Sequence, residues 1–364
     1  MGSTPFRVLA WPAPSDADLN PYLSQIYSAS DQIGAEIVPL QMRHPSQDRS
    51  HVFHIHWPEG IFWGAGGKLL PVAAAKAMAL LRAASATRRA GGLVVLTVHN
   101  LQPHEALSAA QRRLHRWFYR QILNRCDLLV AMTDASLREL QARYPATRDL
   151  DHVLVPHPHY RDVYGAPPSR RDADETLGLQ PKHRRLGVIG RVRASKNVPE
   201  IARAFSDASC ADELLIAGEC ADDIAAEIRE IAACDSRIIF KPGEIPSALL
   251  PTYFAAIDAI VINQSTTLNS ASVLLALSMN TPVVALGMGS ITELAAKLGP
   301  DWIATFRPGL TGGVLDDAVE RLFRHQRRSA VAPLDDVAPT QVSARMLSTF
   351  KSLQARRVSE ADGR

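Results

Sequence analysis

The residues best suited to acid–base chemistry gather in two short segments of the first half of the chain. These segments read HIHWPEG and HNLQPHE, and they contribute His54, His56, Glu59, His99, Asn100, His104 and Glu105. Imidazole titrates near neutrality, and the pKa of a carboxylate can be raised in a closed cleft, so either group could act as a general acid or base. Zinc accepts the same ligands, but the chain has no H-E-x-x-H motif, and we expect no metal.

The two carboxylates are the main candidates for a catalytic base. Glu59 and Glu105 both follow predicted strands, and their motif positions do not separate them. His104 is a weaker third candidate. His54 and His56 lie in one predicted strand, and we expect at most one of them to face a given side. We interpret His54 as a structural residue that satisfies buried backbone groups.

The best local signal in the second half is the loop GRVRASKN at residues 190–197, which follows a predicted strand and precedes a helical pattern. A glycine such as Gly190 allows a ligand to approach the backbone. Arg191 could hold two phosphate oxygens, Lys196 adds a positive charge, and the following helix adds amide donors. The alternative is a solvated basic loop capped by Asn197.

A second loop of small polar residues, at 263–272, leads into an apolar helical pattern. Asn269 and Ser270 lie where backbone N–H groups could face an anion. Taken alone, an ordinary helix cap is the simpler interpretation. Two such loops in one half, both at carboxyl ends of strands, favour a diphosphate site.

Runs of strand type alternate with helical patterns along the whole chain. The predicted strands are 6–11, 51–57, 93–99, 128–131 and 153–155, and then 186–189, 213–217, 237–240, 259–262 and 282–286. A helix is predicted over 20–30. Aliphatic strands separated by helices predict parallel sheets that are covered on both faces. The expected fold class is α/β, with two Rossmann-like doubly wound parallel-sheet domains facing across a cleft.

A segment rich in proline and charge, residues 166–185, separates the two series of strands and is predicted to be a linker. The expected domains are therefore 1–165 and 186–335, followed by a C-terminal helix over 336–364 that packs back towards the N-terminal domain. The total of 364 residues agrees with this division, since a domain averages about 150 residues.

Overall composition excludes several classes of protein. The formal net charge of +3 is too small to indicate a nucleic-acid binder, and 46% hydrophobic residues exclude wholesale disorder. The four cysteines form no C-x-x-C pair, as is typical of a reduced cytosolic protein. No signal peptide or membrane-spanning run is expected.

The positive charge is unevenly distributed. Residues 60–125 contain ten Lys or Arg and a single acidic residue, Glu105. The helical pattern at 68–89 could lie as a basic amphipathic helix on an anionic membrane, or it could pack on the core with a solvated face. The second basic run, at 111–125, favours the membrane.

Several motifs resemble those of a known family in their order along the chain. They are NPYL at 20–23, HWPE at 56–59, HN-L-x-PHE at 99–105, HPHYRD at 157–162, the 190–196 loop, NS at 269–270, LLALS at 274–278 and LGPDW at 298–302. Together they resemble the glycosyltransferases of GT-B architecture. The similarity is greatest to family 94, the inverting β-mannosyltransferases of xanthan-type exopolysaccharide assembly.

The resemblance implies an enzyme without metal or other cofactor. It would take mannose from GDP-mannose to a polyprenyl-diphosphate-linked oligosaccharide at the cytoplasmic face of the plasma membrane. The first domain would bind acceptor and membrane, and the second the nucleotide sugar. The implied acceptor-binding residues are Asn20, Tyr22, His56 and Trp57. The implied donor-binding residues are His99, Gly190, Arg191, Lys196, Asn269 and Ser270.

The resemblance also bears on stereochemistry. Retaining GT-B enzymes carry two glutamates eight residues apart near the second loop, where this chain has Thr267 and Leu275. Their absence favours inversion. The remaining alternatives are a retaining enzyme with another nucleotide sugar, a nucleotide-sugar epimerase and a non-catalytic sensor of nucleotide sugars.

Overall fold

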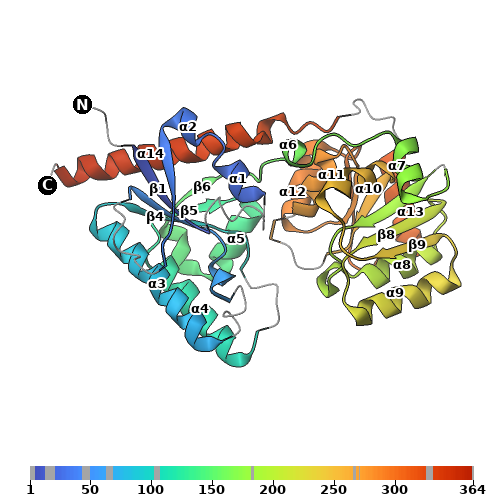
Figure 1. Cartoon of the computed structure of the whole chain (residues 1–364), viewed down its shortest axis with the longest axis horizontal. Coiled ribbons are helices and arrows are strands. Elements are labelled where there is room, and N and C mark those ends of the chain that lie inside the picture. The colour runs from blue at the N-terminus through green and yellow to red at the C-terminus, as the bar shows by residue number, and fades with distance from the viewer. Residues whose placement is uncertain are drawn as a thin grey trace. The chain divides into compact units, whose positions relative to one another are not determined.

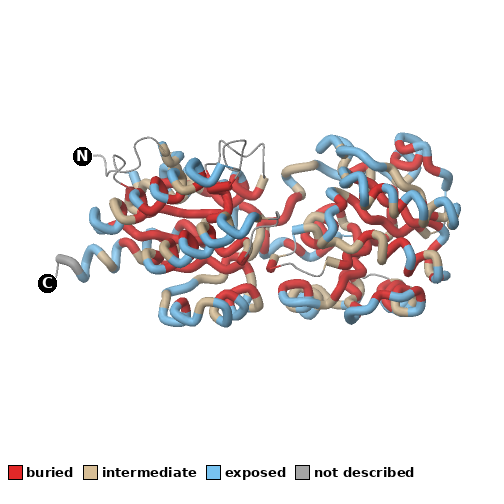
Figure 2. Tube along the Cα trace, turned by 90° about the horizontal axis from the view of Figure 1, so that it is seen from below, coloured by how far each residue is buried: buried red, intermediate tan, exposed pale blue. Residues whose placement is uncertain are grey.

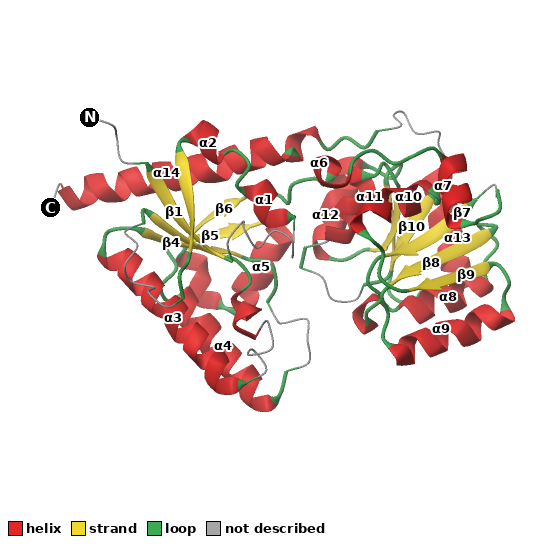
Figure 3. Cartoon of the chain, viewed as in Figure 1, coloured by secondary structure: helices red, strands yellow, loops and turns green. Residues whose placement is uncertain are grey.

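The computed structural model of the chain describes residues 5–12, 21–42, 50–62, 69–101, 107–181, 184–264, 268–269, 271–324 and 331–362. It divides into two compact units, Met1–Pro158 with Asp336–Arg364, and His159–Asp335. Each unit holds a six-stranded parallel sheet with helices on both faces (Figures 1 and 3). The prediction of two doubly wound parallel sheets is confirmed.

The first unit orders its strands β2-β1-β3-β4-β5-β6. Their bounds are β1 Phe6–Trp11, β2 Ala35–Pro39, β3 Val52–Ile55, β4 Leu93–Thr97, β5 Leu128–Ala131 and β6 Asp151–Leu154. The helices of this unit are α1 Tyr22–Ile26, α2 Ser30–Ile33, α3 Leu70–Arg89, α4 Ala109–Leu123, α5 Asp134–Arg143 and α14 Pro339–Asp362, with the 3-10 turns η2 Pro58–Phe62 and η4 Pro145–Asp149. Helix α14 packs on α1 and α2 within this unit, and α3 packs on α4.

The second unit orders its strands β12-β11-β10-β7-β8-β9. Their bounds are β7 Arg185–Ile189, β8 Glu213–Gly218, β9 Ile238–Pro242, β10 Ala259–Ile262, β11 Val283–Leu286 and β12 Ile303–Phe306. Its helices are α6 Arg161–Tyr164, α7 Arg170–Leu177, α8 Val198–Ser206, α9 Asp222–Cys234, α10 Leu250–Ala255, α11 Ala271–Ser278, α12 Gly289–Leu298 and α13 Gly312–Phe323. The 3-10 turns among its described residues include η5 Ala194–Lys196.

The central strands explain why the chain forms parallel sheets. Every residue of β3, β4 and β5 is buried, and the same is true of β7, β8, β10 and β11. Aliphatic side chains therefore pack under helices on both faces of each sheet. Figure 2 shows the buried residues concentrated on these strands, with exposed residues on the outer helices.

The segment predicted as a linker is part of the second unit. Within it, helix α7 packs against α10. Asp174 of α7 accepts a hydrogen bond from the guanidinium of Arg185 at 2.5 Å, and Glu213 accepts another at 2.7 Å. Arg185 has no exposed surface, so these two carboxylates compensate a fully buried charge. The structure divides the chain after Pro158 rather than at residue 165, and the polar residues mistaken for a linker anchor α7.

No helix in the described ranges is both long and apolar enough to cross a bilayer.

Candidate active site

Glu59 lies at the carboxyl edge of the first sheet, in the 3-10 turn η2 that follows β3. Strands β3 and β4 are parallel neighbours, so the segments after them meet at the same edge. There Asn100 donates a hydrogen bond from Nδ2 to Oε1 of Glu59 at 2.7 Å. The carboxyl group is held in place by an amide from the second sequence motif.

The environment of Glu59 suits a general base. Its side chain is buried, and burial raises its pKa to about 7, although the hydrogen bond from Asn100 opposes that rise. A carboxyl group with a pKa near neutrality can be ionised before reaction and still accept a proton. Of the predicted bases, Glu59 is the one within the described residues, because His104 and Glu105 lie outside them.

Four predicted binding residues are joined by a cluster of aromatic rings in the first unit. The rings of Trp57 and His99 stack with centroids 4.1 Å apart, and Trp57 has a left-handed backbone with φ of 43°. The ring of Tyr22 lies 4.8 Å from that of His99 and 5.7 Å from that of His56. Tyr22 and His56 are 1% and 0% exposed, against 9% for Trp57 and 7% for His99, so the stacked pair is closer to solvent. Asn20, the other predicted acceptor residue, lies outside the described residues.

The expectation that His54 and His56 do not share a face is wrong. Residues two apart in a strand point to the same side, and the two rings lie 4.1 Å apart. Both bond to the hydroxyl of Tyr27, from His54 Nδ1 at 2.8 Å and from His56 Nε2 at 3.0 Å. The interpretation of His54 as a residue that satisfies backbone groups is also wrong. Its Nδ1 bonds to Tyr27, and its Nε2 bonds to Oγ1 of Thr97 at 2.7 Å.

Burial keeps this group of histidines uncharged. It lowers the pKa of His56 to about 3 and that of His157 to about 4, and it holds the pKa values of His54 and His99 well below 6.5. The rings are therefore neutral at physiological pH, and each carries one N–H donor and one acceptor nitrogen. They can orient a polar substrate, whereas Glu59 supplies the group that titrates near neutrality.

In the second unit, the predicted phosphate loop joins β7 to α8. Gly190 has φ of +100°. A Cβ added to Gly218 on the neighbouring strand β8 would lie 2.1 Å from the carbonyl oxygen of Gly190. Both positions require glycine. Lys196 is half-buried, and burial, aided by the charge of Arg193, lowers its pKa to about 8. Arg191 is exposed and pairs with Glu219 at 2.8 Å, so phosphate would compete with that carboxylate.

The loop after β10 lies beside the loop after β7. Asn197 donates from Nδ2 to the carbonyl oxygen of Asn263 at 3.1 Å, and Asn263 donates to Glu200 at 2.9 Å. Lys196, Asn263 and Ser272 line a small cavity at the ends of β7 and β10. Asn269 precedes α11, whereas Ser270 lies outside the described residues. The two predicted loops therefore meet at one sheet edge, as a diphosphate site would require.

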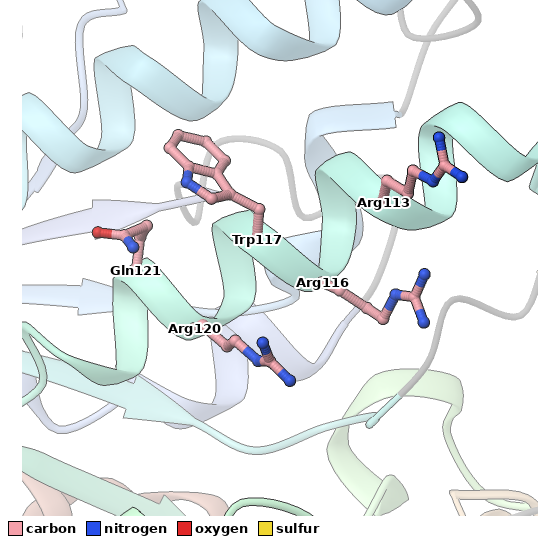
Figure 4. Close-up of a pocket in the computed structure, with 5 residues that line it drawn as sticks. All are labelled: Arg113, Arg116, Trp117, Arg120 and Gln121. Carbon is pink, nitrogen blue, oxygen red and sulfur yellow. The ribbon is translucent and has the colours of Figure 1, made fainter.

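Helices α3 and α4 carry much of the basic charge noted in the sequence. A surface pocket of about 430 Å³ is lined by Arg113, Arg116, Trp117, Arg120 and Gln121 of α4 (Figure 4). In this view Arg116 and Arg120 point below the helix, and Trp117 and Gln121 point above it. A second pocket, of about 260 Å³, shares Trp117 and Gln121 and is also lined by Met78, Leu81, Arg82, Ser85, Arg89 and Arg125.

Helix α3 packs on the core of the first unit, as one of its two alternatives predicts, and it also leaves apolar side chains exposed. Ala77, Leu80 and Ala84 are fully buried and pack on the core, whereas Leu70 and Met78 are 38% and 41% exposed. Lys68, the first basic residue of the predicted segment, lies outside the described residues.

Within the described ranges, no group of three His, Cys, Asp or Glu side chains could hold a metal ion. The neutral histidines bond to one another and to hydroxyl groups instead.

Two residues of the first unit were missed by sequence reasoning. Thr97 precedes His99 by two positions in a predicted strand, so the two side chains were expected on the same face, and this spacing could have identified Thr97. Tyr27 follows α1 and belongs to no motif, so nothing in the sequence connected it with the histidines.

Comparisons with known proteins agree with this architecture. Residues 69–156 match the family described as Glycosyltransferase Family 4. The chain is 29% identical over 309 residues to a GDP-mannose:glycolipid 4-beta-D-mannosyltransferase of Xanthomonas campestris pv. campestris, covering 83% of this chain and 80% of the relative.

Solved structures share the fold at lower sequence identity. A sucrose-phosphate synthase from Thermosynechococcus elongatus matches with a TM-score of 0.66 and 14% identity, over 96% of this chain and 99% of that one. The HepE protein of Anabaena, in complex with UDP, matches with a TM-score of 0.61 and 15% identity, over 98% and 100%.

Proposed function

We propose that this chain, a glycosyltransferase of GT-B architecture, transfers mannose from GDP-mannose to a polyprenyl-diphosphate-linked oligosaccharide with inversion, in exopolysaccharide synthesis. The observation that carries the proposal is the buried carboxyl group of Glu59, held by Asn100 and with a pKa of about 7. The name of the Xanthomonas relative supports the donor and a glycolipid acceptor.

Inversion needs a single base and a single displacement. Glu59 accepts the proton of the acceptor hydroxyl while that oxygen forms a bond to the anomeric carbon. The bond from the anomeric carbon to the diphosphate oxygen breaks, and its electron pair leaves with GDP. Because GDP-mannose is an α-linked donor, the product is a β-mannoside. Glu105 remains the alternative base, with His104 a weaker candidate.

Positive charge and backbone dipoles stabilise the leaving diphosphate. In the second unit this role falls to Lys196, to Arg191 once it is released from Glu219, and to the amides near Asn269 and Ser270. The residue His99 contacts the donor sugar. No metal ion enters the reaction.

A lipid-linked acceptor requires the enzyme to contact the membrane. We propose that α3 and α4 contact the inner face of the plasma membrane. Arg113, Arg116 and Arg120 are exposed, and no ion pair joins them to an acid in the described part of the chain. Trp117 and Met78, 42% and 41% exposed, lie among these arginines and those of the second pocket. Exposed aromatic and apolar side chains beside arginines suit an anionic interface.

The donor and acceptor can be tested together. Purified protein is incubated with bacterial lipid extract and a panel of nucleotide sugars, with and without the lipid. We expect consumption of GDP-mannose that depends on the lipid. Consumption of a different donor would contradict the mannose assignment, and conversion of a donor without lipid would indicate an epimerase.

A further inference from the structure

A continuous hydrogen-bonded chain runs from Thr97 to His99 through the interior of the first unit. Its four links are Thr97 Oγ1 to His54 Nε2 at 2.7 Å, His54 Nδ1 to Tyr27 Oη at 2.8 Å, Tyr27 Oη to His56 Nε2 at 3.0 Å, and His56 Nδ1 to His99 Nε2 at 3.0 Å. Thr97, His54 and His56 are 0% exposed, and Tyr27 is 4% exposed. Each link needs one hydrogen atom, so the links constrain one another.

The hydroxyl of Tyr27 restricts the possible arrangements to two. It has one hydrogen and two ring nitrogens as neighbours. If both histidines donated to it, its own hydrogen would be left without an acceptor, because Tyr27 has no further hydrogen-bond partner in the described part of the chain. Tyr27 therefore donates to one histidine and accepts from the other.

The hydroxyl of Thr97 selects between these two directions. If His54 donated to Thr97, the hydroxyl hydrogen of Thr97 would need another acceptor, and the described residues offer none. Thr97 therefore donates to His54 Nε2, His54 donates from Nδ1 to Tyr27, and Tyr27 donates to His56 Nε2. His56 then carries its proton on Nδ1 and donates it to His99 Nε2.

We infer that Thr97, His54, Tyr27 and His56 form a one-directional hydrogen-bonded chain that fixes His99 as the Nδ1–H tautomer, so that Nδ1 of His99 is a hydrogen-bond donor. The four residues are positioning residues, because they act through His99. Burial keeps the three rings neutral by holding their pKa values below 6.5, so each ring has one donor and one acceptor nitrogen. The link to substrate rests on the proposed role of His99 at the donor sugar, whereas the tautomer does not.

The tautomer can be read directly by nitrogen NMR of the full chain labelled with ¹⁵N-histidine, without substrate. A protonated ring nitrogen resonates well apart from a bare one, and His99→Asn identifies which signals belong to His99. We expect His99 to be protonated on Nδ1. Protonation on Nε2, or an even mixture of the two forms, would overturn the inference even if the enzyme is active.

Substitution of Thr97, the first donor in the series of hydrogen bonds, tests the direction of that series. Thr97→Val keeps the shape of the side chain but removes the hydroxyl, whereas Thr97→Ser keeps the hydroxyl. We expect a mixture of His99 tautomers in Thr97→Val and the wild-type tautomer in Thr97→Ser. The apparent affinity for the donor falls in proportion to the fraction of molecules in which His99 is the Nδ1–H tautomer. We therefore expect kcat/KM to fall about two-fold to ten-fold in Thr97→Val and to recover in Thr97→Ser.

An unchanged His99 tautomer in folded Thr97→Val would show that Thr97 does not set the direction. If wild-type His99 carries its proton on Nδ1 but no sugar is transferred, the proposed function fails while the inferred chain stands. The two failures are therefore distinguishable.

Discussion

At the scale of single residues, two opposing influences set the pKa of the carboxyl group that we propose as the catalytic base. Burial raises the pKa of Glu59, and the hydrogen bond from Asn100 lowers it, with a balance at about 7. A base with this pKa is ionised in much of the population at neutral pH and remains able to take a proton. The neighbouring histidines stay neutral and serve as hydrogen-bonding groups.

Removing the base should slow turnover strongly without preventing donor binding. We expect Glu59→Gln to lose about 10²–10⁴-fold in kcat, because general base catalysis contributes that much, with little change in the Kd of GDP-mannose. The matched variant is Glu105→Gln, measured in the same assay with calorimetric titration of the donor. If only Glu105→Gln loses turnover, the base is Glu105; if neither does, neither carboxylate is the base.

The pH profile should report the same group. A general base must be deprotonated to act, so kcat/KM should rise with pH and level off, with a midpoint at about 7. Asn100→Ala removes the hydrogen bond that lowers the pKa of Glu59, so the rising limb should move to higher pH. Thermal unfolding across the same pH range serves as the control. A limb that stays in place or moves to lower pH would contradict the assignment.

At the scale of elements, the edges of the sheets decide what the sequence could predict. The buried strands β4, β5 and β10 carry continuous aliphatic runs, so their type and position were predictable. Of the four edge strands, β6 and β9 were predicted, whereas β2 and β12 were not. An edge strand pairs on one side and does not require a continuous aliphatic run. The predicted helix at 20–30 is two short helices, α1 and α2, with Tyr27 between them.

The candidate site was predictable only in part, because the sequence shows which residues follow strands but not which side chains they contact. Glu59, His99 and Lys196 were named because each follows a strand in a recognisable segment. The contacts that tune them depend on tertiary packing, as with Asn100 on Glu59 and Glu219 on Arg191. The segment 166–185 was misjudged because its Asp174 appears solvated in sequence but pairs with the buried Arg185.

The close approach of β7 and β8 predicts a specific sensitivity of the phosphate loop. Gly218→Ala would place a Cβ 2.1 Å from the carbonyl oxygen of Gly190, at φ of +144°. Gly243→Ala is a matched control, since its φ is +131° but nothing lies within 4 Å of the added atom. The control should lose about 1–3 kcal/mol of unfolding free energy from backbone strain alone.

We expect Gly218→Ala to lose more stability than this control and, where it folds, to bind GDP more weakly. Denaturant unfolding and calorimetric titration with GDP measure the two effects. Equal stability of the two alanine variants would contradict the inferred steric contact.

At the scale of the whole molecule, the small net charge of +3 conceals a strongly basic surface. Helices α3 and α4, with Arg125 just after α4, present the arginines of the two pockets together with Trp117 and Met78. The comparisons identify a glycosyltransferase fold, and the proposed lipid-linked acceptor would give this basic surface a function at the membrane. In the proposed membrane contact, the positive charge would attract the protein to an anionic bilayer, and the exposed apolar groups would enter the interface.

Vesicle binding tests this surface. Each arginine near an anionic membrane contributes about 1 kcal/mol, so the double variant Arg113→Gln with Arg116→Gln should bind anionic vesicles about 30-fold more weakly. The control pair, Arg171→Gln with Arg345→Gln, removes the same charge from exposed positions on α7 and α14. If both double variants lose the same vesicle affinity, or if the wild-type protein does not bind anionic vesicles at low salt, docking through α4 is contradicted.

The anomeric configuration of the first product tests the central claim most directly. The protein is incubated with GDP-mannose and its lipid-linked acceptor, and NMR of the initial product is recorded before any secondary reaction. Direct displacement by a hydroxyl deprotonated by a single base predicts a β-linked mannose. An α-linked mannose would contradict the inverting mechanism and the role assigned to Glu59.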